Sequence, residues 1–453
     1  MATLGLNLQS LTGSTQGLDV ATIVAQLTYA AQAPERIWQA QQQELQVEMQ
    51  ALTVISGGMS TLLNDINNLT DFNGAIAAVT TTSSDSSLVT AAASAGAALG
   101  SHVVTVNNLA STASYYSNAV ASADTPLATG SFNIQIGSNA PTAITIDDTN
   151  NTLTQLAATI NQANVGVTAN VVTDSNGARL AIVSNSSGAA GDITISNDTT
   201  GLGFTRGSTG TDASLTVDGV PISSASNTVT GVVPNVTFNL VGADPNTQVT
   251  IGVTPDTQTV IDAVNTFVKD YNTLMQSINA GYAIDQVNQT RGPLIGDSTG
   301  DMVQQQLLDM ATYSVTGAGS YSTLASLGIN MENDGTLTVD TTQLTGAITN
   351  DFSNFQKFFQ DASSGFGTYF AKVLTQATDP TQSAVAIDVK SIQSTNQSLQ
   401  TQIDDLETYL ATEKQQWEAQ YNQANILLQQ LPQLEKQLAV QLGYYNPNSS
   451  NGQ

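Results

Sequence analysis

Hydrophobic residues follow a helical period at both ends of the chain and a two-residue period in its middle. Near the N-terminus, Asp19 precedes the apolar residues Ile23, Val24 and Leu27. A short polar residue at that position is typical of a helix N-cap. Pro34 marks the start of a second helix, because proline is tolerated in the first helical turn. The sequence therefore predicts two consecutive helices that divide near Pro34.

The second of these helices has a seven-residue repeat. Its apolar positions form one column of Trp38, Leu45, Leu52, Met59 and Ile66 and another of Ile55, Leu62 and Leu69. Gly57 and Gly58 interrupt the pattern, and each glycine costs about 1 kcal/mol inside a helix. We expect a long helix that is weakened near its middle.

A stronger repeat occupies the C-terminal end. One column is Ile392, Leu399, Leu406, Glu413, Gln420, Leu427 and Leu434, and the other is Val389, Asn396, Ile403, Leu410, Trp417, Ala424, Leu431 and Leu438. About seven heptads of this kind predict a long helix packed along a coiled-coil seam. At about 1.5 Å per residue, residues 388–440 would form a rod of roughly 80 Å. The polar seam positions can set register or partner number, and Pro432 should kink or end the rod.

Between the helical ends, alternating apolar and polar residues predict strands. The alternating runs are 101–107, 131–136, 143–146, 167–172, 178–183, 192–195 and 249–253. Asn176-Gly177, Asp218-Gly219 and Asp334-Gly335 are typical of tight hairpin turns. One helix, capped by Thr152, interrupts the strands, and residues 259–280 form a further amphipathic helix.

These patterns predict an α+β protein in which both termini form a long antiparallel helical leg and β-rich head domains are inserted between them. A length of 453 residues suggests about three units. The expected divisions are an N-terminal leg segment (1–75), the first half of an inner head (76–126), an outer head (127–204), the second half of the inner head (205–256), a helical and hairpin leg domain (257–380) and a C-terminal coiled-coil segment (381–453).

Composition narrows the possible functions. Ten Lys and Arg against 36 Asp and Glu give a net charge of −26. The basic residues are scattered, so there is no basic stripe for nucleic acid or for an anionic membrane surface. No apolar run approaches the ~18 residues that a membrane-spanning helix needs. We expect neither nucleic-acid binding nor membrane insertion.

The chain also offers no catalytic constellation. It has no cysteine, which excludes disulfides, thiolate zinc sites and thiol nucleophiles. Its single histidine, His102, lies in an alternating strand, where an ordinary sheet position is more common than a catalytic one. The neighbouring carboxylates Asp147-Asp148 and Asp404-Asp405 point away from each other in a strand or a helix. We expect no enzyme, no cofactor and no metal, although a hydrolase that uses only carboxylates stays open.

The N-terminal stretch does not resemble a secretory signal, because the first basic residue is Arg36 and no charged region precedes an apolar block. The cysteine-free composition, rich in Thr, Ser and Asn, is typical of an extracellular bacterial surface protein. We expect export without a cleaved signal peptide.

Six short motifs occur in a fixed order along nearly the whole chain. They are Gly17-Leu18-Asp19, with Gln16 before it; the run from Thr81 to Leu88; Gly219-Val220-Pro221-Ile222 followed by Ser226-Asn227-Thr228-Val229; Phe267 to Leu274; Gly292 to Ser298; and Leu327-Gly328-Ile329 with Asp334-Gly335-Thr336-Leu337 and Asp340. Together they resemble the flagellar filament cap family, also called flagellar hook-associated protein 2, in which a serine is usual at the place of Gln16. Residues 127–195 also resemble the small repeat inserted in flagellins and hook-associated proteins.

This resemblance implies a non-enzymatic protein at the distal end of the flagellar filament, where it promotes flagellin polymerisation and prevents the loss of exported flagellin. It implies a ring of identical subunits, usually five. The other implied partners are flagellin, a neighbouring hook-associated junction protein and a cytoplasmic export chaperone at the C-terminal region. It also implies export by the flagellar type III system to the extracellular filament tip.

We expect apolar seam residues to carry leg packing and partner binding. The candidates are Leu45, Leu52, Leu62, Leu399, Ile403, Leu406, Leu410, Trp417, Leu427, Leu431, Leu434 and Leu438. Two alternatives stay open. Flagellin or another hook-associated protein also has helical ends around an inserted head, and a secreted adhesin would use the β-rich head to bind surface glycans.

Overall fold

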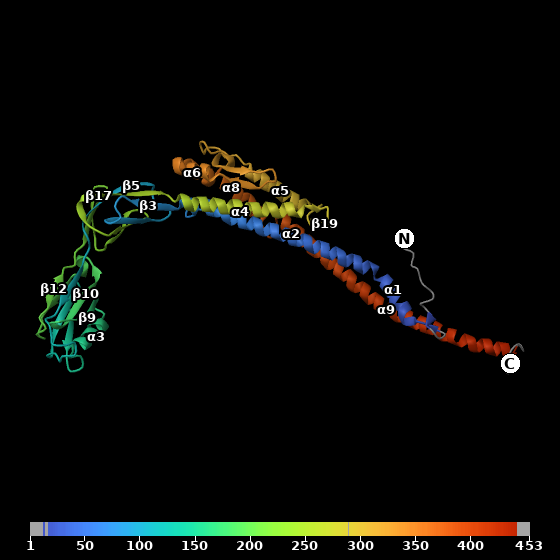
Figure 1. The fold of residues 1–453 in the computed structure, drawn as a ribbon, viewed down its shortest axis with the longest axis horizontal. Helices are drawn as coiled ribbons and strands as arrows, with labels where there is room; N and C mark the ends of the chain where they lie inside the picture. The colour runs from blue at the N-terminus through green and yellow to red at the C-terminus, as the bar shows by residue number, and fades with distance from the viewer. Residues whose placement is uncertain (1–11, 14–16, 289, 442–453) are drawn as a thin grey trace, which may run out of the picture.

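The computed structural model describes residues 12–13, 17–288 and 290–441. The molecule is elongated, with a helical leg at one end and two β-rich heads at the other (Figure 1). The leg helices are α1 (Val20–Ala31), α2 (Ala33–Thr70), α4 (Thr257–Gly281), α5 (Ser298–Ala311), α6 (Thr341–Asn350), α7 (Phe352–Gln360), α8 (Phe366–Ala377) and α9 (Ala384–Gln441). The expected α+β class, with heads inserted between helical ends, is confirmed.

The first two helices begin where the sequence predicts. The Asp19 carboxylate caps α1 and accepts a hydrogen bond from the Thr22 backbone N–H at 3.1 Å. Helix α2 has a proline in its first turn and runs without a break across Gly57 and Gly58. A Cβ at Gly58 would lie 2.9 Å from Leu274 Cδ1 on α4. This glycine therefore permits a close helix–helix approach, and the packing offsets its cost in helix propensity.

Helix α9 is 58 residues long and continues through Pro432 to Gln441. The sequence predicts a kink or an end of the rod at Pro432, and the second alternative is wrong, because the helix continues beyond this residue. Proline removes one backbone donor and crowds the preceding turn, yet the residues on both sides of Pro432 are helical.

The leg core lies mainly between α2, α4, α8 and α9. Helix α2 buries both of its heptad columns from residue 52 onward, at Leu52, Ile55, Met59, Leu62, Ile66 and Leu69. Helices α4, α7 and α8 supply an aromatic cluster of Phe267, Phe355, Phe358, Phe359, Phe366 and Phe370, whose neighbouring rings lie 5.0–6.2 Å apart. Small hairpins complete the leg: β1 (Thr12–Gly13) with β2 (Gly17–Leu18), β18 (Ile284–Asp285) with β19 (Thr290–Arg291), and β20 (Ile329–Met331), which follows the 3-10 turn η3 (Leu324–Leu327), with β21 (Leu337–Val339).

The inner head packs two sheets around one core. The five-stranded sheet has the order β14-β13-β5-β17-β3, and the three-stranded sheet has the order β15-β16-β4. The strands are β3 (Val79–Ser83), β4 (Val89–Ala93), β5 (Gly100–Asn108), β13 (Ala213–Val217), β14 (Val220–Ser224), β15 (Thr228–Val233), β16 (Val236–Leu240) and β17 (Asp244–Pro255). A 3-10 turn, η1 (Ala75–Ala77), joins α2 to β3.

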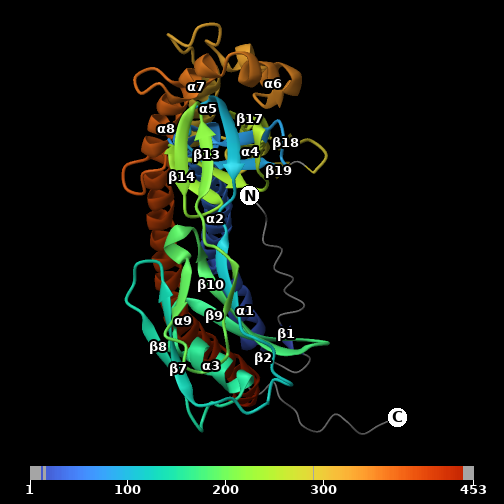
Figure 2. The same ribbon diagram turned by 90° about the vertical axis from the view of Figure 1, so that its left-hand side faces the viewer.

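The outer head has its own core, between two sheets and helix α3 (Leu153–Ala163). One sheet has the order β12-β6-β10-β9 and the other β11-β7-β8. The strands are β6 (Thr112–Tyr116), β7 (Gly130–Ile136), β8 (Thr142–Ile146), β9 (Val167–Asp174), β10 (Gly177–Ser187), β11 (Ile193–Ser196) and β12 (Thr205–Ser208). Figure 2 shows this head below the inner head, and its helix α3 packs mainly against β9.

The three turn predictions hold. The predicted Asn176-Gly177 turn lies between β9 and β10, where Ser175 and Asn176 form the loop and Gly177 begins β10. Asp218-Gly219 joins β13 to β14, and Asp334-Gly335 lies in the loop between β20 and β21. Strands β6 and β12 were not predicted, and both pair within the outer sheet. The outer core therefore draws on residues before 127, such as Ala113, and its sheet includes residues after 204, because strand pairing brings together segments that are about 90 residues apart.

Candidate assembly surfaces

The two ends of the chain pair along the leg. Gln42 Nε2 of α2 donates to the Asn396 backbone oxygen at 3.2 Å and to Gln400 Oε1 at 3.3 Å. Farther along, the Leu18 backbone N–H donates to Asn425 Oδ1 at 2.8 Å. Because the lower-numbered residue meets the higher-numbered part of α9, the segments are antiparallel, as the sequence predicts. Figure 1 shows α1 and α2 lying along α9.

The predicted seam residues fall into four environments. Leu52 and Leu62 are completely buried in the core that α2 shares with α4 and α8. Leu399, Ile403 and Leu410 are 4–8% exposed. Leu45, Leu406 and Trp417 are half-buried. The first two groups are therefore packed within this chain.

The fourth environment is the end of α9, where the seam residues are exposed. Leu427, Leu431, Leu434 and Leu438 are 50–58% exposed, and Ile426 and Leu428 beside them are also exposed. The described part of the chain therefore leaves a stripe of large apolar side chains uncovered, and we call residues 426–438 the free end of α9. Exposed apolar surface of this kind marks an interaction site in soluble proteins.

Like charges meet inside the leg. Asp65 of α2 lies against Asp270 of α4, and burial followed by the repulsion of Asp270 raises the pKa of Asp65 to about 6. Burial, and then the nearby Asp297 and Asp388, also raise the pKa of Glu48 on α2. Among the described residues, the ion pairs are confined to the heads. These leg carboxylates therefore lack a compensating cation.

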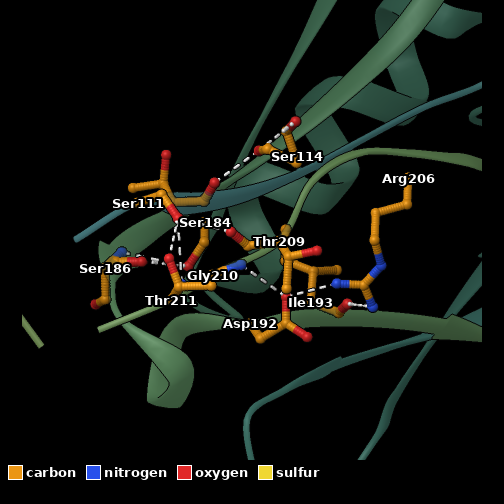
Figure 3. Close-up of polar contacts among 12 residues, drawn as sticks. Ser111, Ser114, Ser184, Ser186, Asp192, Ile193, Arg206, Thr209, Gly210 and Thr211 are labelled. Carbon is orange, nitrogen blue, oxygen red and sulfur yellow. Dashed lines mark hydrogen bonds and ion pairs between the residues drawn. The ribbon is translucent and has the colours of Figure 1, made fainter. Parts of the chain in front are cut away.

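A polar network holds together the two segments that connect the heads and ties them to the outer head (Figure 3). Ser111 and Thr211, on the two connecting segments, share a hydrogen bond of 2.7 Å. On the outer-head side, Asp192 Oδ1 accepts from Arg206 Nη1 at 2.6 Å and from the Gly210 backbone N–H at 3.0 Å. The network joins residues that the sequence pattern did not single out, because their contacts exist only after both heads have folded.

A turn of the outer head also inserts into the inner head. It consists of Gly188 and the 3-10 turn η2 (Ala189–Gly191). The Asp212 carboxylate accepts from the Ala189 N–H at 2.7 Å and from the Ser223 hydroxyl at 3.2 Å. At Gly188 a Cβ would lie 2.7 Å from the Ala225 Cβ. The glycine therefore lets this turn reach the inner head, and the contacts fix the angle between the heads.

Two side chains that the sequence analysis considered for catalysis make hydrogen bonds within the heads. His102 Nδ1 lies 2.8 Å from Asp218 Oδ2, and this hydrogen bond, followed by one from the Val103 N–H, lowers the pKa of Asp218. Asp147 Oδ1 accepts from the backbone and hydroxyl of Thr149 within its turn. Within the described ranges, no group of three or more His, Cys, Asp or Glu residues is placed to hold a metal ion. No helix in the same ranges is both long and apolar enough to span a bilayer.

A long leg with an exposed apolar end, followed by two heads that polar contacts hold to each other, defines a structural protein built for assembly. Residues 16–113 match the family model for the flagellar hook-associated protein 2 N-terminus, and residues 210–433 match the model for its C-terminus. The chain belongs to the flagellar hook-associated protein 2 family, which is a family of structural proteins and not of enzymes.

Individual relatives agree with this assignment. The B-type flagellar hook-associated protein 2 of Pseudomonas aeruginosa is 29% identical over 376 residues, which cover 76% of this chain and 79% of that protein. The flagellar hook-associated protein 2 of Escherichia coli K12 is 26% identical over 381 residues, or 75% of this chain and 78% of that protein. The crystal structure of the D1-D2-D3 domains of the Escherichia coli flagellar cap protein superposes with a TM-score of 0.58 at 26% identity, covering 76% of this chain and 99% of that one.

Proposed function

We propose that this chain caps the distal end of a bacterial flagellar filament, where it promotes flagellin polymerisation and prevents the loss of exported monomers. Family membership and the likeness to a solved flagellar cap protein support this role. The observation that carries it in this chain is the division of α9. Leu399 and Ile403 are packed within the leg, whereas Leu431 and Leu434 are exposed in the described part of the chain.

We propose the partners that the family resemblance implies. Subunits form a ring, which we propose to be a pentamer, with the heads over the filament channel and the legs directed toward flagellin. The free end of α9 contacts flagellin or the neighbouring hook-associated junction protein, and a cytoplasmic chaperone covers the C-terminal region before export. An amphipathic helix can exchange partners in this way, because each partner buries the same apolar stripe.

The leg, the inner head and the outer head act as three units in this proposal, with the outer head beginning near residue 111 and not at the expected residue 127. Each has a separate hydrophobic core. The candidate seam residues serve in two ways: those before 420 hold the leg together, and those after 425 bind partners. Export through the flagellar type III system delivers the protein to the extracellular filament tip.

Deletion of the gene tests the cap. We expect hooks without filaments and monomeric flagellin in the medium, and added purified protein should restore filament growth. Normal filaments in the deletion strain would refute the cap. Normal filaments combined with lost attachment to glycan-coated surfaces would instead favour the adhesin.

A further inference from the structure

The exposed apolar side chains of the outer head lie together on one face. Among residues 111–208, the large hydrophobic side chains exposed by more than a third are Tyr116 (40%), Val172 (54%) and Val183 (37%). Tyr116 pairs with Ala181, and Val172 pairs with Arg179. Because paired residues share a face and alternate residues of a strand do so too, these side chains lie on the same side of the β6-β10-β9 sheet.

The opposite side of this sheet is covered. Leu180 and Ile182 of β10 are completely buried in the outer-head core, and helix α3 packs against β9 and β10. The sheet therefore has one face for folding and one that remains uncovered. We call Tyr116, Val172, Arg179 and Val183 the Tyr116 face.

Arg179 gives this face a positive charge. Its guanidinium carbon lies 5.9 Å from the centroid of the Tyr116 ring, and its Nη1 donates to the Ser117 backbone oxygen at 3.2 Å. Residues 76–256 contain eleven aspartates, no glutamate, no lysine and two arginines. The other arginine, Arg206, is paired with Asp192. Within the described parts of the heads, Arg179 is therefore the arginine without a carboxylate within ion-pair distance.

We propose that the Tyr116 face binds the acidic head surface of a second copy of this chain. The inference rests on the proposed ring and names the surface that closes it. A second head offers an excess of carboxylates to Arg179, and tyrosine and arginine are the residues that most often anchor protein interfaces. In a ring the contact is heterologous and repeats at each subunit, so a modest patch stabilises the closed assembly.

The position of the face suits this role. Strand β6 begins directly after Ser111, whose hydrogen bond to Thr211 belongs to the junction between the heads. The junction therefore fixes the direction in which the face points, and little conformational entropy is lost when a partner binds.

The proposal is tested by analytical sedimentation of the full chain at several protein concentrations and several salt concentrations. We expect the wild type to assemble, and salt to weaken the assembly. Val172→Glu and Arg179→Glu should each raise the dissociation constant about tenfold or more. Val220→Glu is the matched control, because Val220 is a strand valine that is 57% exposed on the inner head. It should change the constant by less than about twofold.

Circular dichroism and thermal melting establish that the variants are folded. If Arg179→Glu does not fold, Arg179→Gln is used in its place. Wild-type assembly with unchanged assembly of the Val172 and Arg179 variants would overturn the Tyr116 face and leave the ring intact. A wild type that stays monomeric at every concentration would overturn the ring as well. Unchanged assembly together with lost binding to immobilised glycans would assign the face to sugars and overturn the proposal.

Discussion

Asp65 of α2 and Asp270 of α4 lie side by side across a helix interface that supplies no cation to either within the described residues. The interface is otherwise apolar, with Leu62 and Ile66 of α2 packed in the same core as Val264 and Phe267 of α4. Burial and repulsion therefore favour the protonated form of Asp65 in the folded state.

This pair predicts that acid stabilises the leg locally. The pKa of Asp65 is about 6 when folded, against 3.8 for the free side chain. The folded state holds the proton more tightly, so the contribution of Asp65 to stability falls as the pH rises from about 4 to about 6, and stays low above that. Asp65→Asn should raise the melting temperature by a few degrees at pH 7 and little at pH 4.

Melting curves of the wild type and of Asp65→Asn between pH 4 and 8 measure this difference in melting temperature. Asp262→Asn is the control, because Asp262 lies on the same helix as Asp270 but is exposed. The raised pKa of Asp65 would be contradicted if Asp65→Asn raised the melting temperature equally at all pH values, or if Asp262→Asn raised it by the same amount.

Charges in the buried part of the seam should disrupt the leg. Leu399 and Ile403 are 8% and 4% exposed, and burying a carboxylate without a partner at such a site costs about 3 kcal/mol or more. Leu399→Glu combined with Ile403→Glu should abolish filament growth while the heads stay folded, because each head has its own core.

Electron microscopy of deletion cells that express the variant measures filament growth. Thermal melting of the purified variant, followed separately by a signal from the helices and a signal from the strands, measures whether the heads stay folded. The paired control is Gln397→Glu with Gln402→Glu, at exposed positions of the same helix. Normal filaments from the seam variant would show that the pairing of α9 is dispensable.

Charges at the free end of α9 should separate stability from function. Leu431 and Leu434 are each 50% exposed. Leu431→Glu with Leu434→Glu should therefore leave the free energy of unfolding within about 0.5 kcal/mol of the wild type and still impair filament growth. Melting and a filament-rescue assay give the two readings. A large loss of stability would mean that this stripe packs within the chain.

Neighbouring glycines of α2 should respond differently to the same change. Gly57 has open space where a Cβ would lie, whereas a Cβ at Gly58 would come 2.9 Å from Leu274 Cδ1. Gly57→Ala should stabilise the protein by roughly 0.5–1 kcal/mol through helix propensity. Gly58→Ala should lose that gain to the contact with α4. Denaturant titration measures both, and equal gains would show that the α2–α4 contact is not tight at Gly58.

Local patterns in the sequence account for the elements and their order. Heptad columns such as Leu52–Met59 and Leu399–Leu406 lie within single helices, and the turn pairs Asn176-Gly177 and Asp218-Gly219 act over two residues, so local periodicity and backbone preference suffice to predict them. The nested order of leg and heads follows from where the hydrophobic period changes.

What each apolar column contacts depends on the tertiary fold. Leu62, Leu410 and Leu431 all occupy apolar heptad positions, yet Leu62 is completely buried, Leu410 is 5% exposed and Leu431 is 50% exposed. The repeat is the same in all three, so the difference comes from the segment that lies opposite each residue. Helix α4 covers Leu62, the N-terminal helices cover Leu410, and the described part of the chain does not cover Leu431.

The charged and polar contacts also depend on the tertiary fold. Asp65 and Asp270 are 205 residues apart in the chain, and Ser111 and Thr211 are 100 residues apart. Neither pair has a local signature, because a contact between distant segments depends on the path of the whole chain. Periodicity is a property of neighbouring residues and can be found in the sequence, whereas burial, repulsion and the angle between the heads depend on which surfaces meet after folding.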